Sequence, residues 1–329
     1  MDNTIFAQSS GTIRALENKL IDSSKFEALA DAKDFSECIR MLQDSRYASY
    51  VSMPSYEEGL KMALEDLYKD MYKITPLKSV VDLPAARYDG HNIKSIIKGN
   101  ILNTDVSDIL IEAGTIPARS LGTMIKDKNF KEMPDILKDA AIKASEDYEE
   151  THNPQYIDLA VDEGTFGYMI DIAEESKIEY LNEFVKTYID VTNIKSYVRM
   201  RSQNKDSDYY RKFFLVGGYI GFDMFESFLN EPLEKFGEKL VYTPYYKWAK
   251  DGIGEYLKTL NLGHIEKFGD NFIIDYLRKA KYINMGPEII IAYIFAVENE
   301  IKSIRIILTG KKNKVNSDII RERLREAYV

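Results

Sequence analysis

The tripeptide Ile-Lys-Ser occurs three times in this chain of 329 residues. The copies begin at Ile93, Ile194 and Ile301, so successive copies lie 101 and 107 residues apart. Similarity that returns at a nearly fixed interval is the mark of a repeated structural unit. The spacing therefore predicts a unit of about 103 residues that is present three times.

A second sequence marker keeps the same phase. Gly-Thr-Ile begins at Gly11 and again at Gly114, and the related Gly-Tyr-Ile begins at Gly218. Each of these glycines precedes one Ile-Lys-Ser copy, and the glycines are 103 and 104 residues apart. Together the two markers predict three similar domains, which would cover residues 1–113, 114–217 and 218–329.

The local patterns are those of helices. Ser55 stands three residues before Glu58, and Ser24 stands three residues before Glu27, which is the spacing of a capping box at a helix N-terminus. Apolar residues after Ser55 recur with the period of an amphipathic helix. No turn signals flanked by alternating apolar residues suggest a sheet. The expected fold class is all-α.

Proline and glycine suggest where some helices begin and end. Pro84 and Pro134 are expected in first helical turns. Pro287 is expected to open a long helix that Gly310 closes. Within it, the nine apolar residues 289–297 are too few to cross a membrane, which takes about 20. They predict a helix that is buried on all sides.

The charge and the single cysteine limit the function classes. The formal net charge is −9, which gives no overall support to nucleic-acid binding. Cys38 has no second cysteine to pair with, and a lone cysteine is most simply a small buried apolar residue. We therefore expect neither a disulfide nor a nucleic-acid partner.

Motifs that carry chemistry are missing from the sequence. The three histidines are far apart, and no phosphate-binding loop with its Gly-Lys-Ser/Thr ending is present. The glycines of Val-Gly-Gly-Tyr-Ile-Gly, residues 216–221, indicate close packing of helices. Asp158 and Asp162 are interpreted as an exposed helix face. We expect no catalytic residue, no cofactor and no metal ion.

Positive charge gathers after the repeated tripeptides, at residues 195–212 and 302–329. One explanation is that these cations offset the negative ends of helix dipoles. The other is that they form a docking face for an acidic partner. The sequence leaves both open. Within each tripeptide, the isoleucine is expected in the core and the lysine at its edge.

The longer motif around the second copy is Ile-Asp-x-x-Asn-Ile-Lys-x-x-x-Arg-x-Arg, from Ile189 to Arg201. With the length, the helical character and the three units, it resembles the C subunit of bacterial and archaeal V/A-type rotary ATPases, the counterpart of the d subunit of the eukaryotic vacuolar ATPase. The first copy keeps Asp89 and Asn92 but has Lys98 in the place of Arg199. The third copy is weaker and has Glu300 in the place of the asparagine.

The resemblance implies three helical domains in a funnel with pseudo-threefold symmetry. Such a protein would be a non-catalytic central-stalk adaptor that joins the shaft, made of the D and F subunits, to the membrane ring of c-type (proteolipid) subunits. It would serve ATP-driven ion transport or ATP synthesis, at the cytoplasmic face of the cell membrane and without inserting into it. The residues expected to contact the shaft are Lys94, Lys98, Lys195, Arg199, Arg201, Lys302 and Arg305.

Two other function classes compete with this interpretation. The first is a cytosolic helical scaffold of an unrelated complex, although scaffold repeats are usually shorter, at about 20–50 residues. The second is an all-helical enzyme with a hidden carboxylate site, which saturable binding of a divalent metal ion would reveal.

Overall fold

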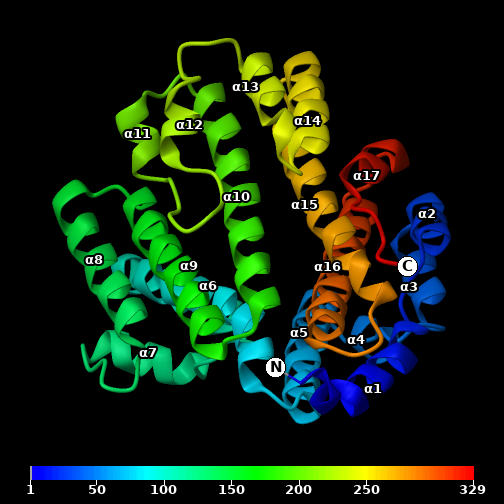
Figure 1. The fold of residues 1–329 in the computed structure, drawn as a ribbon. Coiled ribbons are helices and arrows are strands. Elements are labelled where there is room, and N and C mark those ends of the chain that lie inside the picture. The colour runs from blue at the N-terminus through cyan, green and yellow to red at the C-terminus, as the bar shows by residue number, and fades with distance from the viewer. Residues whose placement is uncertain (1) are drawn as a thin grey trace. The chain divides into compact units, whose positions relative to one another are not determined.

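The structure, a computed structural model, describes residues 2–329, and all regular secondary structure in that range is helical. The all-α prediction is therefore confirmed. The chain divides into two compact units, each of which is visible in Figure 1. Unit 1 consists of Met1–Pro76 and Glu231–Val329, and unit 2 consists of Leu77–Asn230. The division into three similar domains, at residues 1–113, 114–217 and 218–329, remains a prediction from the sequence repeat.

Unit 1 combines helices from both ends of the chain. Its α-helices are α1 (Ala7–Glu17), α2 (Ser23–Asp31), α3 (Phe35–Leu42), α4 (Ala48–Val51), α5 (Tyr56–Ile74), α13 (Leu233–Lys239), α14 (Tyr246–Thr259), α15 (Gly263–Arg278), α16 (Pro287–Lys312) and α17 (Ser317–Arg323). Short 3₁₀ helices span Asn3–Phe6, Leu240–Tyr242 and Lys279–Tyr282. In Figure 1 the blue helices of the N-terminal part pack against the orange and red helices of the C-terminal part.

The centre of unit 1 is the long helix α16. The residues from Ile289 to Val297 are each at most 6% exposed, so this stretch is buried on all sides, as predicted. Helices α1, α2, α3, α5, α15 and α17 pack around α16. In residues 2–329, no helix is both long and apolar enough to span a membrane. The residues of this run are apolar because they are buried in the core of unit 1.

Unit 2 is built on further long helices. Its α-helices are α6 (Lys78–Leu102), α7 (Ala118–Lys126), α8 (Asp135–Thr151), α9 (Gln155–Ser176), α10 (Glu179–Ser202), α11 (Ser207–Arg211) and α12 (Phe222–Glu226), with a 3₁₀ turn at Ser107–Ile109. Apolar side chains of α6, α7, α8 and α9 form one core, in which Ile93, Leu137 and Ile157 are fully buried. Helix α9 packs against α6, α8 and α10.

The structure confirms one of the two predicted capping boxes and corrects the other, and it moves one of the predicted proline positions. The Ser55 hydroxyl caps α5 by accepting a hydrogen bond from the Glu58 amide at 3.3 Å, as expected. Helix α2 is instead capped by Asp22, whose carboxylate is 2.8 Å from the Lys25 amide, because a side chain one residue before the helix reaches its free amides. Pro84 lies inside α6 and not in its first turn.

A glycine near the end of α16 lets a neighbouring helix approach it closely. Helix α16 runs two residues past Gly310, to Lys312, so this glycine does not end the helix. A Cβ atom on Gly310 would lie 2.7 Å from the side chain of Ile320, which packs there from α17. The absence of a side chain thus lets α17 lie close to α16. Nothing in the local sequence indicates that neighbour.

Candidate functional site

The aspartate and the asparagine of the motif on α10 hold a loop by its backbone. Asp190 accepts hydrogen bonds from the amides of Tyr219 and Ile220, at 3.1 and 3.0 Å. The Asn193 amide nitrogen donates to the Leu215 carbonyl at 2.8 Å, and its oxygen accepts from the Leu215 amide at 2.9 Å. Residues three apart share one face of a helix, so one turn of α10 secures the loop between α11 and α12.

The first copy of the motif, on α6, makes the same arrangement. Asp89 accepts from the amides of Thr115 and Ile116, at 3.0 and 3.1 Å, and from the Thr115 hydroxyl at 2.7 Å. Asn92 makes a pair of hydrogen bonds with the backbone of Ile111, at 2.8 and 2.9 Å. The side chains of Asp89 and Asn92 are completely buried, like those of Asp190 and Asn193. The motif thus has one structural role in both copies.

Two of the glycine markers belong to this arrangement. A Cβ atom on Gly114 or Gly218 would lie 2.2 Å from a carboxylate oxygen, that of Asp89 or Asp190 respectively. Only glycine lets the loop backbone come this close to the carboxylate. Gly218 is in a loop, so close packing of two helices is not the reason for its presence, contrary to our interpretation. Gly11 has no such neighbour and lies within α1.

The third copy, on α16, holds a different partner with a different side chain. Glu300 stands in the place of the asparagine and accepts hydrogen bonds from the Ile21 amide and, at 2.7 Å, from the Tyr47 hydroxyl. Val297, which stands in the place of the aspartate, is fully buried. The third long helix therefore holds a segment near the start of the chain, 279 residues away in the sequence.

One of the backbone amides held in each of the three arrangements occupies an equivalent place. Ile21, Ile116 and Ile220 each stand directly before the N-cap residue of a short helix, namely α2, α7 or α12. We call the three arrangements loop clamps, formed by Asp89 and Asn92, by Asp190 and Asn193, and by Glu300. The clamp on α6 holds the segment between α6 and α7, and the clamp on α10 holds the loop between α11 and α12. The last clamp returns to the beginning of the chain.

Burial sets the protonation behaviour of two clamp carboxyls. It raises the pKa of Asp89 to about 6, although the hydrogen bonds from Thr115 and Ile116 act in the opposite direction. Burial also raises the pKa of Glu300 to about 7, against the hydrogen bonds from Tyr47 and Ile21. The guanidinium of Arg46 is a further, smaller influence that lowers the Glu300 pKa. These groups bind backbone and hydroxyl groups, so their arrangement fixes loops in place.

The repeated Ile-Lys-Ser tripeptides behave as predicted. Ile93, Ile194 and Ile301 are at most 2% exposed, whereas the lysine that follows each of them is partly exposed. Cys38 is completely buried, as predicted for a lone cysteine. Burial raises the pKa of its thiol to about 11. Its sulfur lies 3.4 Å from the Leu29 carbonyl oxygen.

Three of the seven predicted contact residues are paired within their own unit. Lys94 is 2.8 Å from a carboxylate oxygen of Asp162, and Lys98 pairs with Asp158, so the face of α9 that carries these aspartates meets α6. Lys302 pairs with Asp270 of α15. Each pair keeps an exposed portion, as expected for surface ion pairs that contribute about 1 kcal/mol or less.

The other four predicted residues differ in their surroundings. Arg201 donates to the Phe228 carbonyl at 2.8 Å and to the Tyr197 hydroxyl at 3.0 Å, so it supports the local fold. Arg199 and Arg305 are exposed, and Lys195 is half-buried. The first five predicted residues lie on α6 and α10 of unit 2, and Lys302 and Arg305 lie on α16 of unit 1.

The predictions from the sequence give the clamp residues no role. The signal was present, because Asp-x-x-Asn precedes Ile-Lys in two copies of the motif. A polar pair on the buried face of an otherwise apolar helix predicts hydrogen-bonded partners, since buried polar groups are almost always satisfied. In residues 2–329, no three side chains among histidine, cysteine, aspartate and glutamate are grouped as a metal ion would require.

Comparison with known proteins extends over almost the whole chain. A family model described as the ATP synthase (C/AC39) subunit matches residues 9–323. The C subunit of the V-type sodium ATPase of Enterococcus hirae is 25% identical over 96% of this chain and 97% of its own length. The C subunit of the A-type ATP synthase of Methanocaldococcus jannaschii is 26% identical over 98% of this chain and 87% of its own length. The C subunit of the A-type ATP synthase of Methanosarcina acetivorans is 24% identical over 97% of this chain and 92% of its own length.

Proposed function

Because this chain belongs to the ATP synthase (C/AC39) subunit family, we propose that it is the central-stalk adaptor of a rotary ATPase. In this role it joins the shaft of D and F subunits to the membrane ring of c-type subunits. The adaptor turns with the shaft and carries torque during ATP-driven ion transport or ATP synthesis. It works at the cytoplasmic face of the membrane, as a peripheral and non-catalytic component.

The observation that carries the proposal is the family match over residues 9–323. The loop clamps support it on physical grounds. A part that transmits torque has to resist deformation, and densely packed helices with low compressibility meet that need. Each clamp adds buried hydrogen bonds between a long helix and a loop, and these fix the loop relative to the helix axis.

Copurification is the direct test of this role. The tagged protein, isolated from its native membranes, should bring down the D and F subunits together with ring subunits. It should remain with the membrane through the complex and be released without detergent when the complex is dissociated. Recovery with a different set of partners would contradict the adaptor role and favour the scaffold interpretation. Recovery with no partner would contradict both.

We further propose that the seven basic residues Lys94, Lys98, Lys195, Arg199, Arg201, Lys302 and Arg305 contribute to the contact with the shaft. Arg199 and Arg305 give the clearest test because both are exposed. Arg199→Glu combined with Arg305→Glu should weaken binding of a purified D–F complex by at least about tenfold. The matched control is Lys126→Glu combined with Lys128→Glu, which reverses two exposed charges at the end of α7. Equal binding by all three proteins would remove these residues from the contact.

A further inference from the structure

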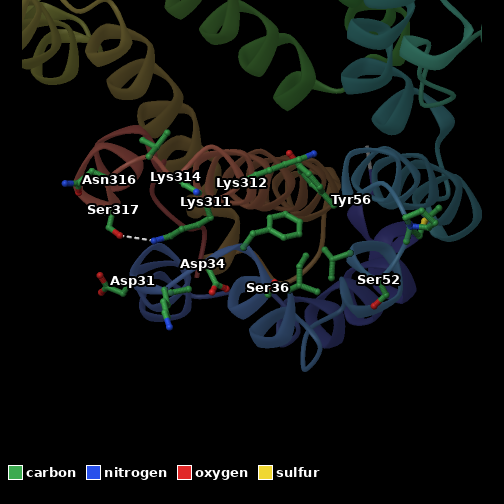
Figure 2. A pocket seen from close by; sticks show the side chains of 18 residues that line it. Asp31, Asp34, Ser36, Ser52, Tyr56, Lys311, Lys312, Lys314, Asn316 and Ser317 are labelled. Atoms are coloured by element: carbon green, nitrogen blue, oxygen red, sulfur yellow. Dashed lines mark hydrogen bonds between the residues drawn. The ribbon is translucent and has the colours of Figure 1, made fainter.

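Unit 1 has a groove of about 1170 Å³ at the C-terminal end of α16. Figure 2 shows its lining side chains, which come from the end of α2, from α3, from residues 51–56 and from residues 311–317. Part of the wall is apolar and is formed by Phe35, Ile39, Val51, Met53 and Tyr56. The groove therefore offers a concave surface on which apolar side chains of another molecule can pack.

The groove carries cations that no carboxylate neutralises within residues 2–329. The ammonium group of Lys311, a residue that is only 9% exposed, donates to the Ser317 hydroxyl at 2.8 Å (Figure 2). The ammonium of Lys312 lies 5.3 Å from the centre of the Tyr56 ring. Lys33 and Lys314 are exposed and also line the groove. A buried lysine normally has an anionic partner, because desolvating its charge is costly.

The two acidic residues of the lining are already engaged. Asp31 pairs with Arg321 of α17. Asp34 caps α3, where its carboxylate accepts from the Glu37 amide at 2.9 Å. The groove thus has a local excess of positive charge in a chain whose net charge is −9.

Hydrogen bonding to the end of α16 does not account for the lysines. The last carbonyl groups of the helix have other partners: Val315 donates to the Gly310 carbonyl at 2.8 Å, and both amides of Asn313 donate to the Thr309 carbonyl. The ammonium groups of Lys311 and Lys312 are directed to Ser317 and to Tyr56. The two lysines lie in the last turn of α16, where their charge also offsets the helix dipole, but their ammonium groups are not held by the carbonyls of the helix end.

We propose that this groove is a docking site for an acidic segment of a partner protein. Carboxylate side chains of the segment pair with Lys311, Lys312 and Lys314, and its apolar side chains pack against Phe35 and Ile39. A protein segment fits better than an anionic membrane, because the surface is concave and a membrane presents a flat face. The proposal does not rest on the adaptor role, and none of its residues belongs to the seven discussed above.

The test uses the whole protein and a synthetic peptide of about 15 residues that combines glutamates with leucines at helical spacing. Binding is measured by fluorescence anisotropy. Lys312→Glu combined with Lys314→Glu should weaken binding by roughly tenfold or more. The matched control is Lys126→Glu combined with Lys128→Glu. Lys126 and Lys312 are both the last residue of a helix, and Lys128 and Lys314 both have positive φ, at 51° and 56°.

Two further measurements separate docking in the groove from general attraction between charges. Ser36→Trp narrows the groove without a change in charge and should also weaken binding of the peptide. Vesicles that contain phosphatidylserine should not bind the unchanged protein. The proposal is wrong if the unchanged protein does not bind the peptide, if both lysine double variants bind it equally well, if Ser36→Trp has no effect, or if the vesicles bind and the peptide does not.

Discussion

At the scale of single residues, the molecule depends on a few buried polar side chains that hold backbone. Asn193 satisfies both the amide and the carbonyl of Leu215, and Asn92 does the same for Ile111. A buried backbone group that loses its partner costs about 1–3 kcal/mol, which is more than a surface ion pair contributes. We therefore expect each clamp to contribute more to the free energy of unfolding than the ion pairs of the basic residues on the same helices.

Asn193→Ala should lower the free energy of unfolding by about 3 kcal/mol, because it leaves both backbone groups of Leu215 without partners. Hydrogen exchange of the Leu215 amide should accelerate as well. Gln203→Ala, an exposed change just beyond the end of α10, serves as the control and should alter stability by less than about 0.5 kcal/mol. Urea denaturation measures the free energy of unfolding of both variants. A similar loss of this free energy in Asn193→Ala and in Gln203→Ala would contradict the role of the clamp.

Glu300 should make stability depend on pH in a predictable direction. Its pKa in the folded protein is about 7, above the ordinary value of 4.5, so the folded state binds more protons between these pH values. Protonation therefore favours folding, and the contribution is lost as pH rises through 7. Relative to Glu300→Gln, the unchanged protein should lose roughly 3 kcal/mol of stability between pH 5 and pH 8.

The other groups around Glu300 do not titrate in this window. Tyr47 and Tyr293 have pKa values raised above 10, chiefly by burial, and Arg46 stays charged, with a raised pKa. The raised pKa of Asp89 acts in the same direction but is common to both proteins, so it cancels in the difference. A stability difference that is independent of pH would show that Glu300 does not titrate as inferred.

At the scale of elements, close approach between helices depends on particular glycines. A Cβ atom on Gly164 of α9 would lie 2.3 Å from the Cβ of Ala140 on α8, a contact that neither short side chain can relieve. Gly122 of α7 has open space around it. Both are helical glycines, yet only one of them is required by a neighbour.

The same substitution should thus have opposite effects at these two positions. Gly164→Ala should destabilise the protein by about 1–3 kcal/mol, because the two helices are forced apart. Gly122→Ala should stabilise it by about 0.5–1 kcal/mol, because alanine is the better helix former and restricts the unfolded chain. Thermal unfolding of the two variants beside the unchanged protein measures both effects. Stabilisation by Gly164→Ala would refute the packing argument.

At the scale of the whole molecule, the two ends of the chain are tied together within unit 1. Arg14 of α1 donates to the carbonyls of Ala280 and Ile283, at 2.5 and 2.9 Å. Arg321 of α17 pairs with Glu27 and Asp31 of α2. Together with the clamp between Glu300 and Ile21, these contacts make unit 1 depend on residues at both ends of the sequence.

Deletion of residues 2–21 should therefore weaken unit 1 more than unit 2. The deletion removes the fully buried side chains of Phe6 and Ile13 and leaves the Glu300 carboxyl without the Ile21 amide. Hydrogen exchange should speed up in α16 while the core helices of unit 2, α6 and α9, keep their protection. Equal loss of protection in both units would show that they do not have separate cores.

The sequence by itself determined the helical class, the family, the cap at Ser55, and which residue of each repeated tripeptide faces the core. These features follow from local spacing, because helix periodicity and capping involve residues only a few positions apart. The tertiary structure alone decided the partners: Ile21 for Glu300, Asp162 for Lys94, and the groove beside Lys312. Such contacts join residues that are distant along the chain, and a local pattern cannot specify which distant segment packing will bring alongside.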